Sequence, residues 1–210
     1  MQRRYIRLRL KISSLTHCAK RQTDAGDEGM QEKRALRVTT ATPTLLRALQ
    51  ALEYRFTVTQ ELDAAFDRPV RDGLRDVTPR EKNYFNDPQQ FAAYLDSRDG
   101  AFFVTLVDER PVGYLAVSRN WNGLALVEDI AIDSGFRRCG CGSALLTHAI
   151  GWAHEQQLAG VTLETQNTNV AACLLYEKMG FELGGIDRHL YRALHARPAE
   201  VALFWYLWFR

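Results

Sequence analysis

Residues 124–143 read LALVEDIAIDSGFRRCGCGS, and this stretch decides how the chain of 210 residues folds. Its first nine residues are apolar except for two adjacent carboxylates, and such a run predicts a buried strand, Leu124–Ile132. A turn follows in which Gly140 and Gly142 stand two residues apart. Apolar residues then recur at helical spacing over 142–158, so the stretch predicts a strand, a glycine-rich turn and a long helix in that order.

The same patterns extend in both directions from this stretch. Apolar runs predict strands, apolar residues at helical spacing predict helices, and scattered prolines among charges indicate loops. Strands and helices alternate through the second half, which is typical of an α/β sheet with helices on both faces. The expected elements are helices over 43–52 (N-cap Thr42) and 169–179, strands around 56–58 and over 101–108, 112–118, 161–165, 183–191 and 201–209, and loops with short helical pieces over 61–90.

The composition is that of a globular protein and excludes several functional classes. Apolar residues make up 46% of the chain and charged residues 25%, and the net charge is only +2. Neither a nucleic-acid partner nor a membrane partner is therefore indicated. We expect one domain, residues 36–210, after an N-terminal extension, residues 1–35, that is either disordered or not native, with Met30 as the alternative start. Within the extension, residues 6–12 alternate as a strand would.

The cysteines and histidines do not predict a metal site. Cys18, Cys139, Cys141 and Cys173 lack the paired C-x₂-C spacing of zinc sites, and the five histidines show no ligand spacing. So few cysteines in a chain of this length do not indicate a disulfide framework either. We expect reduced thiols, a cytoplasmic protein and no metal.

The turn after the first strand has the properties of an anion site. Glycines at 140 and 142 let the backbone approach a ligand closely, and successive N–H groups at a helix start attract negative charge. Arg137 and Arg138 add positive charge suited to a pyrophosphate. The turn lacks the lysine of a mononucleotide P-loop and the third glycine of a dinucleotide-binding turn.

Two motifs, in order, resemble the conserved blocks of the GNAT acetyltransferases. Arg137-x-x-Gly140-x-Gly142 is similar to the R/Q-x-x-G-x-G/A signature of that family, and NVAACLLYEKMGF at 169–181 resembles its second block. The resemblance implies a GNAT fold, an α/β fold whose mixed central sheet is flanked by helices and contains two splayed parallel strands. It also implies acetyl-CoA as the cosubstrate.

The resemblance further implies which residues hold acetyl-CoA. The pantetheine arm would insert between the splayed strands and pair with the backbone of the first one. Backbone amides of the glycine-rich turn would hold the pyrophosphate, while Asn169 would contact the arm and Tyr176 would lie near the sulfur. The implied cofactor-binding residues are Ile130, Ala131, Ile132, Arg137, Arg138, Cys139, Gly140, Cys141, Gly142, Ser143, Asn169 and Tyr176.

Amide formation requires a base for the amine and an acid for the departing thiolate. Strand alternation places Glu128 on one face together with Ile130 and Ile132, and Asp129 on the other face. We expect Glu128 to be the base and Tyr176 to be the acid. Asp129 is the alternate base or a residue that orients the amine.

The flanking sequence resembles one branch of the family, the streptothricin (nourseothricin) acetyltransferases. The resemblance covers roughly residues 53–207 and includes WNG at 121–123, LETQ at 163–166 and EVALFWY at 200–206. It implies a small cationic acceptor with a primary amine, namely the β-lysine moiety of streptothricin, and hence a role in antibiotic resistance. Candidate acceptor-binding residues are Trp121, Glu164 and Asp187.

Other acceptors stay open at the level of sequence. The amine could instead belong to a polyamine, an aminoglycoside, or a protein N-terminus or lysine, and the chain could bind acetyl-CoA without catalysis. Residues 53–100 contain ten Asp/Glu against seven Lys/Arg, which either attracts a cationic acceptor or forms a solvated face. Both a monomer and a homodimer are compatible with the sequence.

Overall fold

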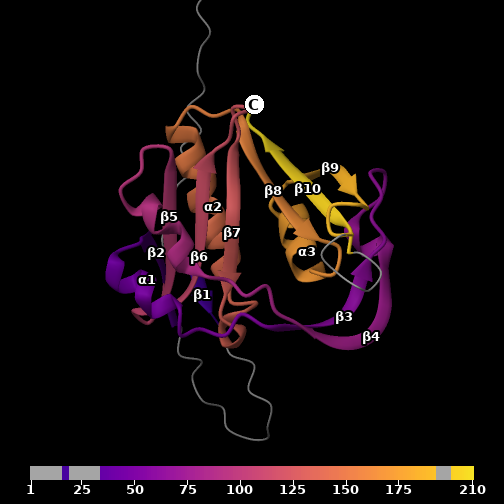
Figure 1. Cartoon of the computed structure of the whole chain (residues 1–210), viewed down its shortest axis with the longest axis horizontal. Helices are drawn as coiled ribbons and strands as arrows, with labels where there is room; N and C mark the ends of the chain where they lie inside the picture. The colour runs from indigo at the N-terminus through magenta and orange to yellow at the C-terminus, as the bar shows by residue number, and fades with distance from the viewer. Residues whose placement is uncertain (1–15, 19–33, 193–199) are drawn as a thin grey trace, which may run out of the picture.

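The computed structural model describes residues 16–18, 34–192 and 200–210 of the chain. Within these residues, eight strands form one sheet in the order β1-β2-β5-β6-β7-β8-β10-β9, and β3 and β4 form a separate two-stranded sheet (Figure 1). Neighbouring strands of the large sheet are antiparallel, except that β7 and β8 run parallel. The mixed central sheet that the sequence predicts is therefore confirmed.

Most elements lie within a few residues of their predicted positions. The strands are β1 (Thr16–Cys18), β2 (Arg34–Thr40), β3 (Phe56–Leu62), β4 (Leu74–Lys82), β5 (Gly100–Val107), β6 (Arg110–Arg119), β7 (Ala125–Ile132), β8 (Gly160–Gln166), β9 (Glu182–Asp187) and β10 (Ala202–Trp208). The helices are α1 (Pro43–Leu49), α2 (Cys141–Glu155) and α3 (Val170–Lys178), with short 3-10 helices η1 (Val70–Gly73), η2 (Pro88–Leu95) and η3 (Ser134–Phe136).

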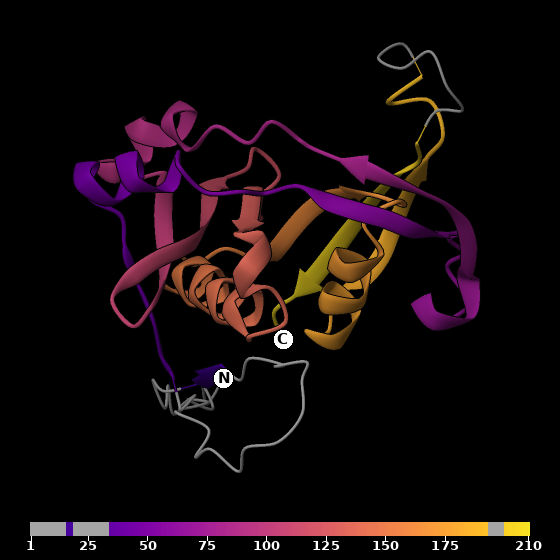
Figure 2. The same ribbon diagram turned by 90° about the horizontal axis from the view of Figure 1, so that it is seen from below.

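Helices cover both faces of the sheet, as Figure 2 shows. On one face, α2 and α3 pack on a core that includes Leu115, Val127 and Leu163. On the other face, α1 and η2 pack on a smaller core that includes Phe102 and Tyr114. Because each strand presents alternate side chains to the two faces, the central strands are buried on both sides.

Capping side chains explain where two of the helices begin. The Thr42 hydroxyl accepts a hydrogen bond from the N–H of Leu45 at 3.3 Å, with Pro43 at the first helical position. The Asn169 carbonyl oxygen accepts one from the N–H of Ala172 at 3.2 Å. Each cap satisfies one of the four N–H groups that a helix start leaves unpaired. The predicted N-cap at Thr42 is confirmed.

Three of the described strands were missed by the sequence patterns. The loop prediction over 61–90 was wrong for β4, which pairs antiparallel with β3. A two-stranded ribbon has exposed surfaces, so β4 is rich in charged residues and lacks the apolar alternation of a core strand. Pro79 lies where the pairing register of the ribbon shifts, a position where proline is tolerated. The other two are β1, within the proposed N-terminal extension, and β2, which spans the proposed domain boundary.

The N-terminal segment contributes to the sheet at its β1 edge. Strand β2 begins at Arg34, and β1 pairs antiparallel with it in the register Thr16↔Leu36. The strand predicted over residues 6–12 lies outside the described residues. In the described part of the chain, no helix is both long enough and apolar enough to cross a bilayer.

Candidate active site

The site is built where β7 and β8 separate. The two strands pair only from Ala125↔Val161 to Val127↔Leu163, although β7 continues to Ile132 and β8 continues to Gln166. Figure 1 shows the two strands meeting at one end and diverging towards the other. Beyond the last pair, each strand turns an edge of backbone N–H and C=O groups towards the gap. The end of the pairing confirms the predicted splay. Because buried backbone groups need hydrogen-bond partners, the two free edges suit an extended ligand.

A β-bulge at Glu128 changes which side chains face the site. Val117 pairs with Val127 and Ala116 pairs with Asp129, so Glu128 is the extra residue of β7. A bulge of this kind interrupts the alternation of side chains. Glu128 and Asp129 consequently lie on the same face, which is the face of Tyr114 and Ser118. The expectation that the two carboxylates lie on opposite faces was wrong, because the alternation rule assumes an uninterrupted strand.

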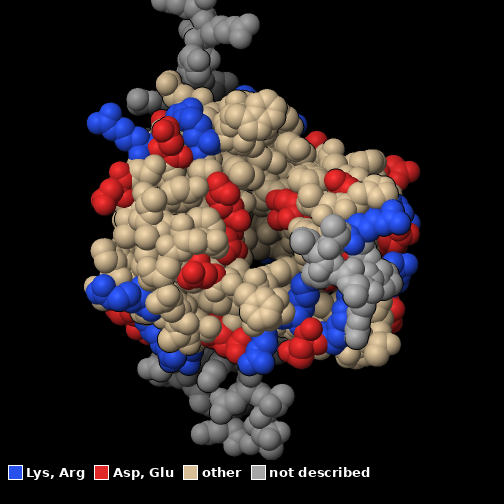
Figure 3. Space-filling model, in the orientation of Figure 1, with Lys and Arg blue, Asp and Glu red and all other residues tan. Residues whose placement is uncertain are grey.

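A cavity of about 630 Å³ opens at the splay. Residues from β7, β8, α3 and the segment after β4 line it, including Tyr84, Phe91 and Tyr176. Three carboxylates line it as well, and the described lining residues include no Lys or Arg. Figure 3 shows a hollow in the middle of this face, with Asp and Glu side chains beside it. The electrostatic potential of the cavity therefore favours a cationic ligand.

Asp129 is the most heavily hydrogen-bonded of these carboxylates. The Tyr114 hydroxyl donates to its Oδ2 at 2.5 Å, and the Asn86 amide nitrogen lies 3.0 Å from both of its oxygens. Burial raises the pKa of Asp129 above its ordinary value, and the hydrogen bonds from Tyr114 and Asn86 only partly oppose that effect. Asp129 is thus a carboxylate that retains a proton more readily than an exposed one.

Glu128 lies at the more open side of the cavity. Its Oε1 accepts hydrogen bonds from Ser118 Oγ at 2.6 Å and from the Tyr94 hydroxyl at 3.1 Å. The Glu128 side chain is exposed, in contrast to that of Asp129. Both candidate bases therefore reach the cavity, in different environments.

Tyr176 projects from α3 and lines the same cavity. Its side chain is 3% exposed and packs against Phe181 and Trp205, with ring centroids 6.0 and 6.1 Å away. Burial raises the pKa of the Tyr176 hydroxyl well above its ordinary value, and the negative charges of Asp129 and Glu164 contribute. Tyr176 therefore stays protonated near neutral pH and can act as a proton donor.

The glycine-rich turn forms the start of α2. Gly140 is the N-cap residue with a φ of 84°, a left-handed conformation that favours glycine. No side chain caps this helix, so its first N–H groups stay available for an anion. A Cβ on Gly142 would lie 2.9 Å from a Leu175 methyl carbon, so glycine there also lets α2 approach α3. The geometry of this turn is therefore compatible with an anion such as a pyrophosphate.

The side chains of the turn are used differently from the prediction. Arg137 donates to the carbonyl oxygens of Tyr54 at 2.5 Å and Ile132 at 3.3 Å. The Arg137 guanidinium thus anchors the turn to the rest of the fold, and burial lowers its pKa. Arg138 adopts a positive φ of 63°, which shapes the same turn.

The cysteines divide into two groups. Cys141 and Cys173 are free and buried, and burial raises the pKa of both thiols. Cys139 is disulfide-bonded, so the expectation of reduced thiols was wrong for this residue. Cysteine spacing identifies paired metal motifs but does not show which cysteines form a disulfide. Within the described residues, no group of His, Cys, Asp or Glu side chains is arranged to hold a metal.

The predicted acceptor-binding residues are not all brought together. Glu164 lines the cavity. Trp121 is 94% exposed in the turn between β6 and β7 and does not line the cavity. Asp187 accepts hydrogen bonds from the N–H groups of His189 and Leu190 at 2.7 and 3.1 Å and therefore stabilises the turn after β9.

Several cavity residues were not predicted from the sequence. Asn86 follows β4, Gln166 ends β8, and Tyr191 lies beyond β9. These residues come from segments far apart in the chain, so no local spacing could identify them. Gln166 could have been predicted from LETQ at 163–166, because it stands two residues after Glu164 and residues two apart on a strand point to the same face.

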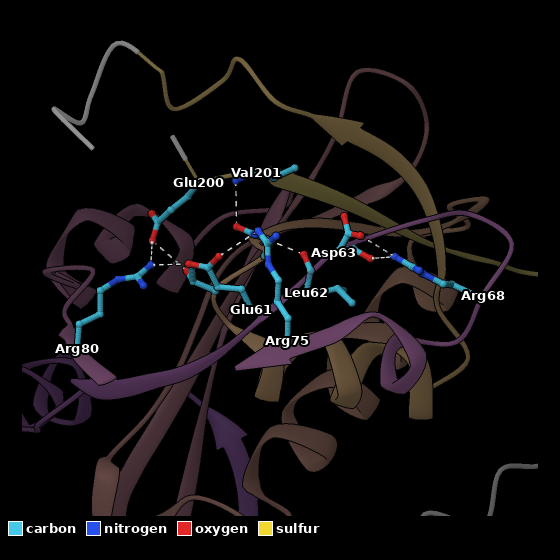
Figure 4. A network of polar contacts seen from close by, with 10 residues as sticks. Glu61, Leu62, Asp63, Arg68, Arg75, Arg80, Glu200 and Val201 are labelled. Atoms are coloured by element: carbon cyan, nitrogen blue, oxygen red, sulfur yellow. Dashed lines mark hydrogen bonds and ion pairs between the residues drawn. The ribbon is translucent and has the colours of Figure 1, made fainter. Parts of the chain in front are cut away.

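A polar network holds the β3–β4 ribbon against the second half of the sheet, as Figure 4 shows. Asn167 Nδ2 donates to the Leu62 carbonyl at 3.3 Å, and Asn167 Oδ1 accepts from the Val201 N–H at 3.0 Å. Glu200 pairs with Lys82 and lies 3.8 Å from Arg80. The network fixes the segment after β4, which carries Tyr84 and Asn86 over the cavity.

Comparison with known proteins identifies acetyltransferases as relatives of this chain. The model of the acetyltransferase (GNAT) family matches residues 68–181. Streptothricin acetyltransferase A of Bacillus subtilis (strain 168) is 38% identical over 128 residues (61% of this chain, 73% of the relative), and an Escherichia coli streptothricin acetyltransferase is 35% identical over 158 residues (75% and 87%).

Two solved acetyltransferase structures are similar to this chain as well. A Bacillus anthracis str. Ames protein named as a streptothricin acetyltransferase, in complex with acetyl coenzyme A, superposes with a TM-score of 0.75 at 32% identity and covers 83% of this chain and 100% of its own. A nourseothricin acetyltransferase superposes with a TM-score of 0.66 at 31% identity and covers 82% of this chain and 97% of its own.

Proposed function

Because this chain belongs to the GNAT acetyltransferase family and is an acetyl-CoA-dependent N-acetyltransferase, we propose that its acceptor is streptothricin, acetylated on a primary amine of the β-lysine moiety. The observation that carries the proposal is the cavity at the splay, which three carboxylates line without a described basic residue. Similarity to relatives named for streptothricin, over 75% of the chain in one case, points the same way. Acetylation of the antibiotic would confer resistance in the cytoplasm, where acetyl-CoA is available.

The chain offers a fitting site for acetyl-CoA, which supplies the acetyl thioester. The N–H groups at the start of α2, in residues 138–143, would bind the pyrophosphate. The free edge of β7 at Ile130–Ile132 would pair with the amide groups of the pantetheine arm, because β8 no longer pairs with it there. Asn169 and Tyr176, which line the cavity, would then lie beside the arm.

Of the two carboxylates on β7, we assign Asp129 as the base. An acceptor ammonium must lose a proton before its nitrogen can attack, and a base is most effective when its pKa lies near the working pH. Burial raises the pKa of Asp129 in that direction. Asp129 also lies close enough to Tyr176 to raise the pKa of its hydroxyl. In this assignment, Glu128 orients the acceptor from the open side of the cavity.

Tyr176 is the proton donor in the proposed reaction. The sulfur that departs from the acetyl group carries negative charge as the new amide bond forms. The Tyr176 hydroxyl, which carries its proton at neutral pH as any tyrosine does, would transfer that proton to the sulfur. The products are the acetylated amine and the free thiol.

Purified protein, acetyl-CoA and streptothricin test the proposal directly, with released thiol as the readout. We expect turnover of streptothricin well above that of spermidine, an aminoglycoside or a lysine peptide. Tyr176→Phe and Asp129→Asn should each reduce kcat about tenfold to a thousandfold. Streptothricin turnover no higher than that of spermidine would refute the acceptor assignment. Unchanged rates in both variants would refute the assigned roles.

A further inference from the structure

Two oxygen atoms from β8 lack hydrogen-bond partners at the wall of the active-site cavity. They are Glu164 Oε1 and Gln166 Oε1, which are buried and unpaired in the described part of the chain. Gln166 is only 8% exposed, and both residues line the cavity. Since they are two residues apart on one strand, their side chains point to the same side.

Tyr191 hydrogen-bonds both side chains, yet Glu164 Oε1 and Gln166 Oε1 themselves lack a donor in the described part of the chain. A buried oxygen without a donor is unfavourable, and native proteins pair nearly all such atoms. Burial raises the pKa of Glu164, and a hydrogen bond with Tyr191 only partly offsets that effect. Tyr191 also hydrogen-bonds Gln166, so the three side chains form one polar wall. No described Lys or Arg lines the cavity to complete it.

Glu164 and Gln166 of this polar wall lie on β8, across the splay from the proposed base Asp129 on β7. Val127 and Leu163 form the last pair between the two strands. Asp129 lies two residues beyond that pair on β7, and Glu164 lies one residue beyond it on β8. Paired strands are about 4.8 Å apart, and these strands are diverging, so the two carboxylates face one another across a wider gap. The base on β7 and the unpaired oxygens on β8 therefore belong to opposite walls of the splay.

We propose that Glu164 Oε1 and Gln166 Oε1 bind a second ammonium group of the acceptor, one that is not acetylated. An ammonium has three N–H donors and a positive charge, which matches one carboxylate oxygen and one amide oxygen. The subsite therefore adds affinity for an acceptor that carries a second ammonium group near the amine that is acetylated. The inference rests on the proposed function, with streptothricin as the acceptor, and adds Gln166 as a second acceptor-binding residue.

Three variants test this subsite. Glu164→Gln removes the charge with little change of shape, and Gln166→Met removes the acceptor oxygen. Glu182→Gln, at an exposed position on β9 outside the cavity lining, is the matched control. We expect the first two to raise the KM for streptothricin about tenfold to a hundredfold, as loss of a charge-assisted hydrogen bond would, with kcat changed less than about threefold. The control should change neither.

Calorimetric titration of streptothricin into each protein without acetyl-CoA gives a second readout, in which the Kd should rise by the same factor. Wild-type protein that acetylates streptothricin supports the proposed function whatever the variants do. Unchanged KM and Kd in Glu164→Gln and Gln166→Met would then overturn the subsite alone. A lower melting temperature with equal loss of kcat and no change in KM would indicate a structural role and would overturn it as well.

Discussion

The hydrogen bond between Tyr114 and Asp129 allows a test of which carboxylate is the base. Tyr114 is fully buried, its ring stacks on Phe102 with centroids 5.3 Å apart, and its hydroxyl lies 2.5 Å from Asp129 Oδ2. Tyr114→Phe keeps the ring and removes only the hydroxyl. A hydrogen bond to an ionised group contributes about 1.5–3 kcal/mol, and one pKa unit corresponds to about 1.4 kcal/mol. Loss of the hydroxyl should therefore shift the pKa of Asp129 by about one to two units.

The direction of the change follows from the ionised form. The Tyr114 hydroxyl stabilises the charged carboxylate and so lowers the pKa of Asp129 against the effect of burial. Without it, the pKa rises further, and a base that must be deprotonated works only at higher pH. We expect the acidic limb of the kcat/KM profile to move up by about one to two pH units in Tyr114→Phe, measured by thiol release at saturating acetyl-CoA.

Ser118→Ala provides the matched control, because Ser118 donates to Glu128 at 2.6 Å. If Asp129 is the base, this variant leaves the acidic limb in place. An acidic limb that moves in Ser118→Ala and stays fixed in Tyr114→Phe would refute our reasoning and identify Glu128 as the base.

The same variant has a consequence for stability. A carboxyl group whose pKa is raised by folding binds more protons in the folded state, so its contribution to stability is complete at low pH and is lost as the pH rises through the folded pKa. Tyr114→Phe raises that pKa further. Its loss of stability, measured by urea unfolding, should therefore be larger above the folded pKa of Asp129 than at acid pH.

Three further predictions concern the frame of the site. Asn167→Ala removes two hydrogen bonds from a 5%-exposed side chain and leaves two backbone groups unpaired at about 1–3 kcal/mol each, so urea unfolding should show a loss of about 2–5 kcal/mol. Asn122→Ala, which removes a bond at 3.2 Å in an exposed turn, should change stability by less than about 1 kcal/mol. Gly160→Ala would place a Cβ 2.2 Å from the Leu207 carbonyl oxygen and should lower the free energy of unfolding by about 1–3 kcal/mol. Gly151→Ala, inside α2, would place a Cβ with no atom within 4 Å and should raise the free energy of unfolding by about 0.5–1 kcal/mol. Similar melting temperatures for the two glycine variants would contradict this packing.

The sequence was most informative where the signal is local. The strand, turn and helix over 124–158 follow from hydrophobic spacing and from glycines that the backbone requires, and the structure places β7, Gly140 and α2 accordingly. The N-cap Thr42 is local as well. Each of these features depends on residues within a few positions of one another, so a linear pattern is sufficient to predict them.

Sequence patterns were less informative where distant segments meet. Strand β4 carries the charges of an exposed ribbon and therefore resembles a loop. The bulge at Glu128 depends on pairing with β6 and moves Glu128 to the face of Asp129, which no alternation rule can anticipate.

The sequence by itself determined the fold class, the glycine-rich turn before α2 and the residue types that the chemistry requires. Only the tertiary structure decided which of them share a cavity: Asp129, Glu164 and Tyr176 do, and Trp121 and Asp187 do not. It also decided the environment of each group, since burial raises the pKa of Asp129, Glu164 and Tyr176. The physical reason is that backbone propensities act over a few neighbouring residues, whereas burial and hydrogen bonding depend on contacts between strands far apart in the chain.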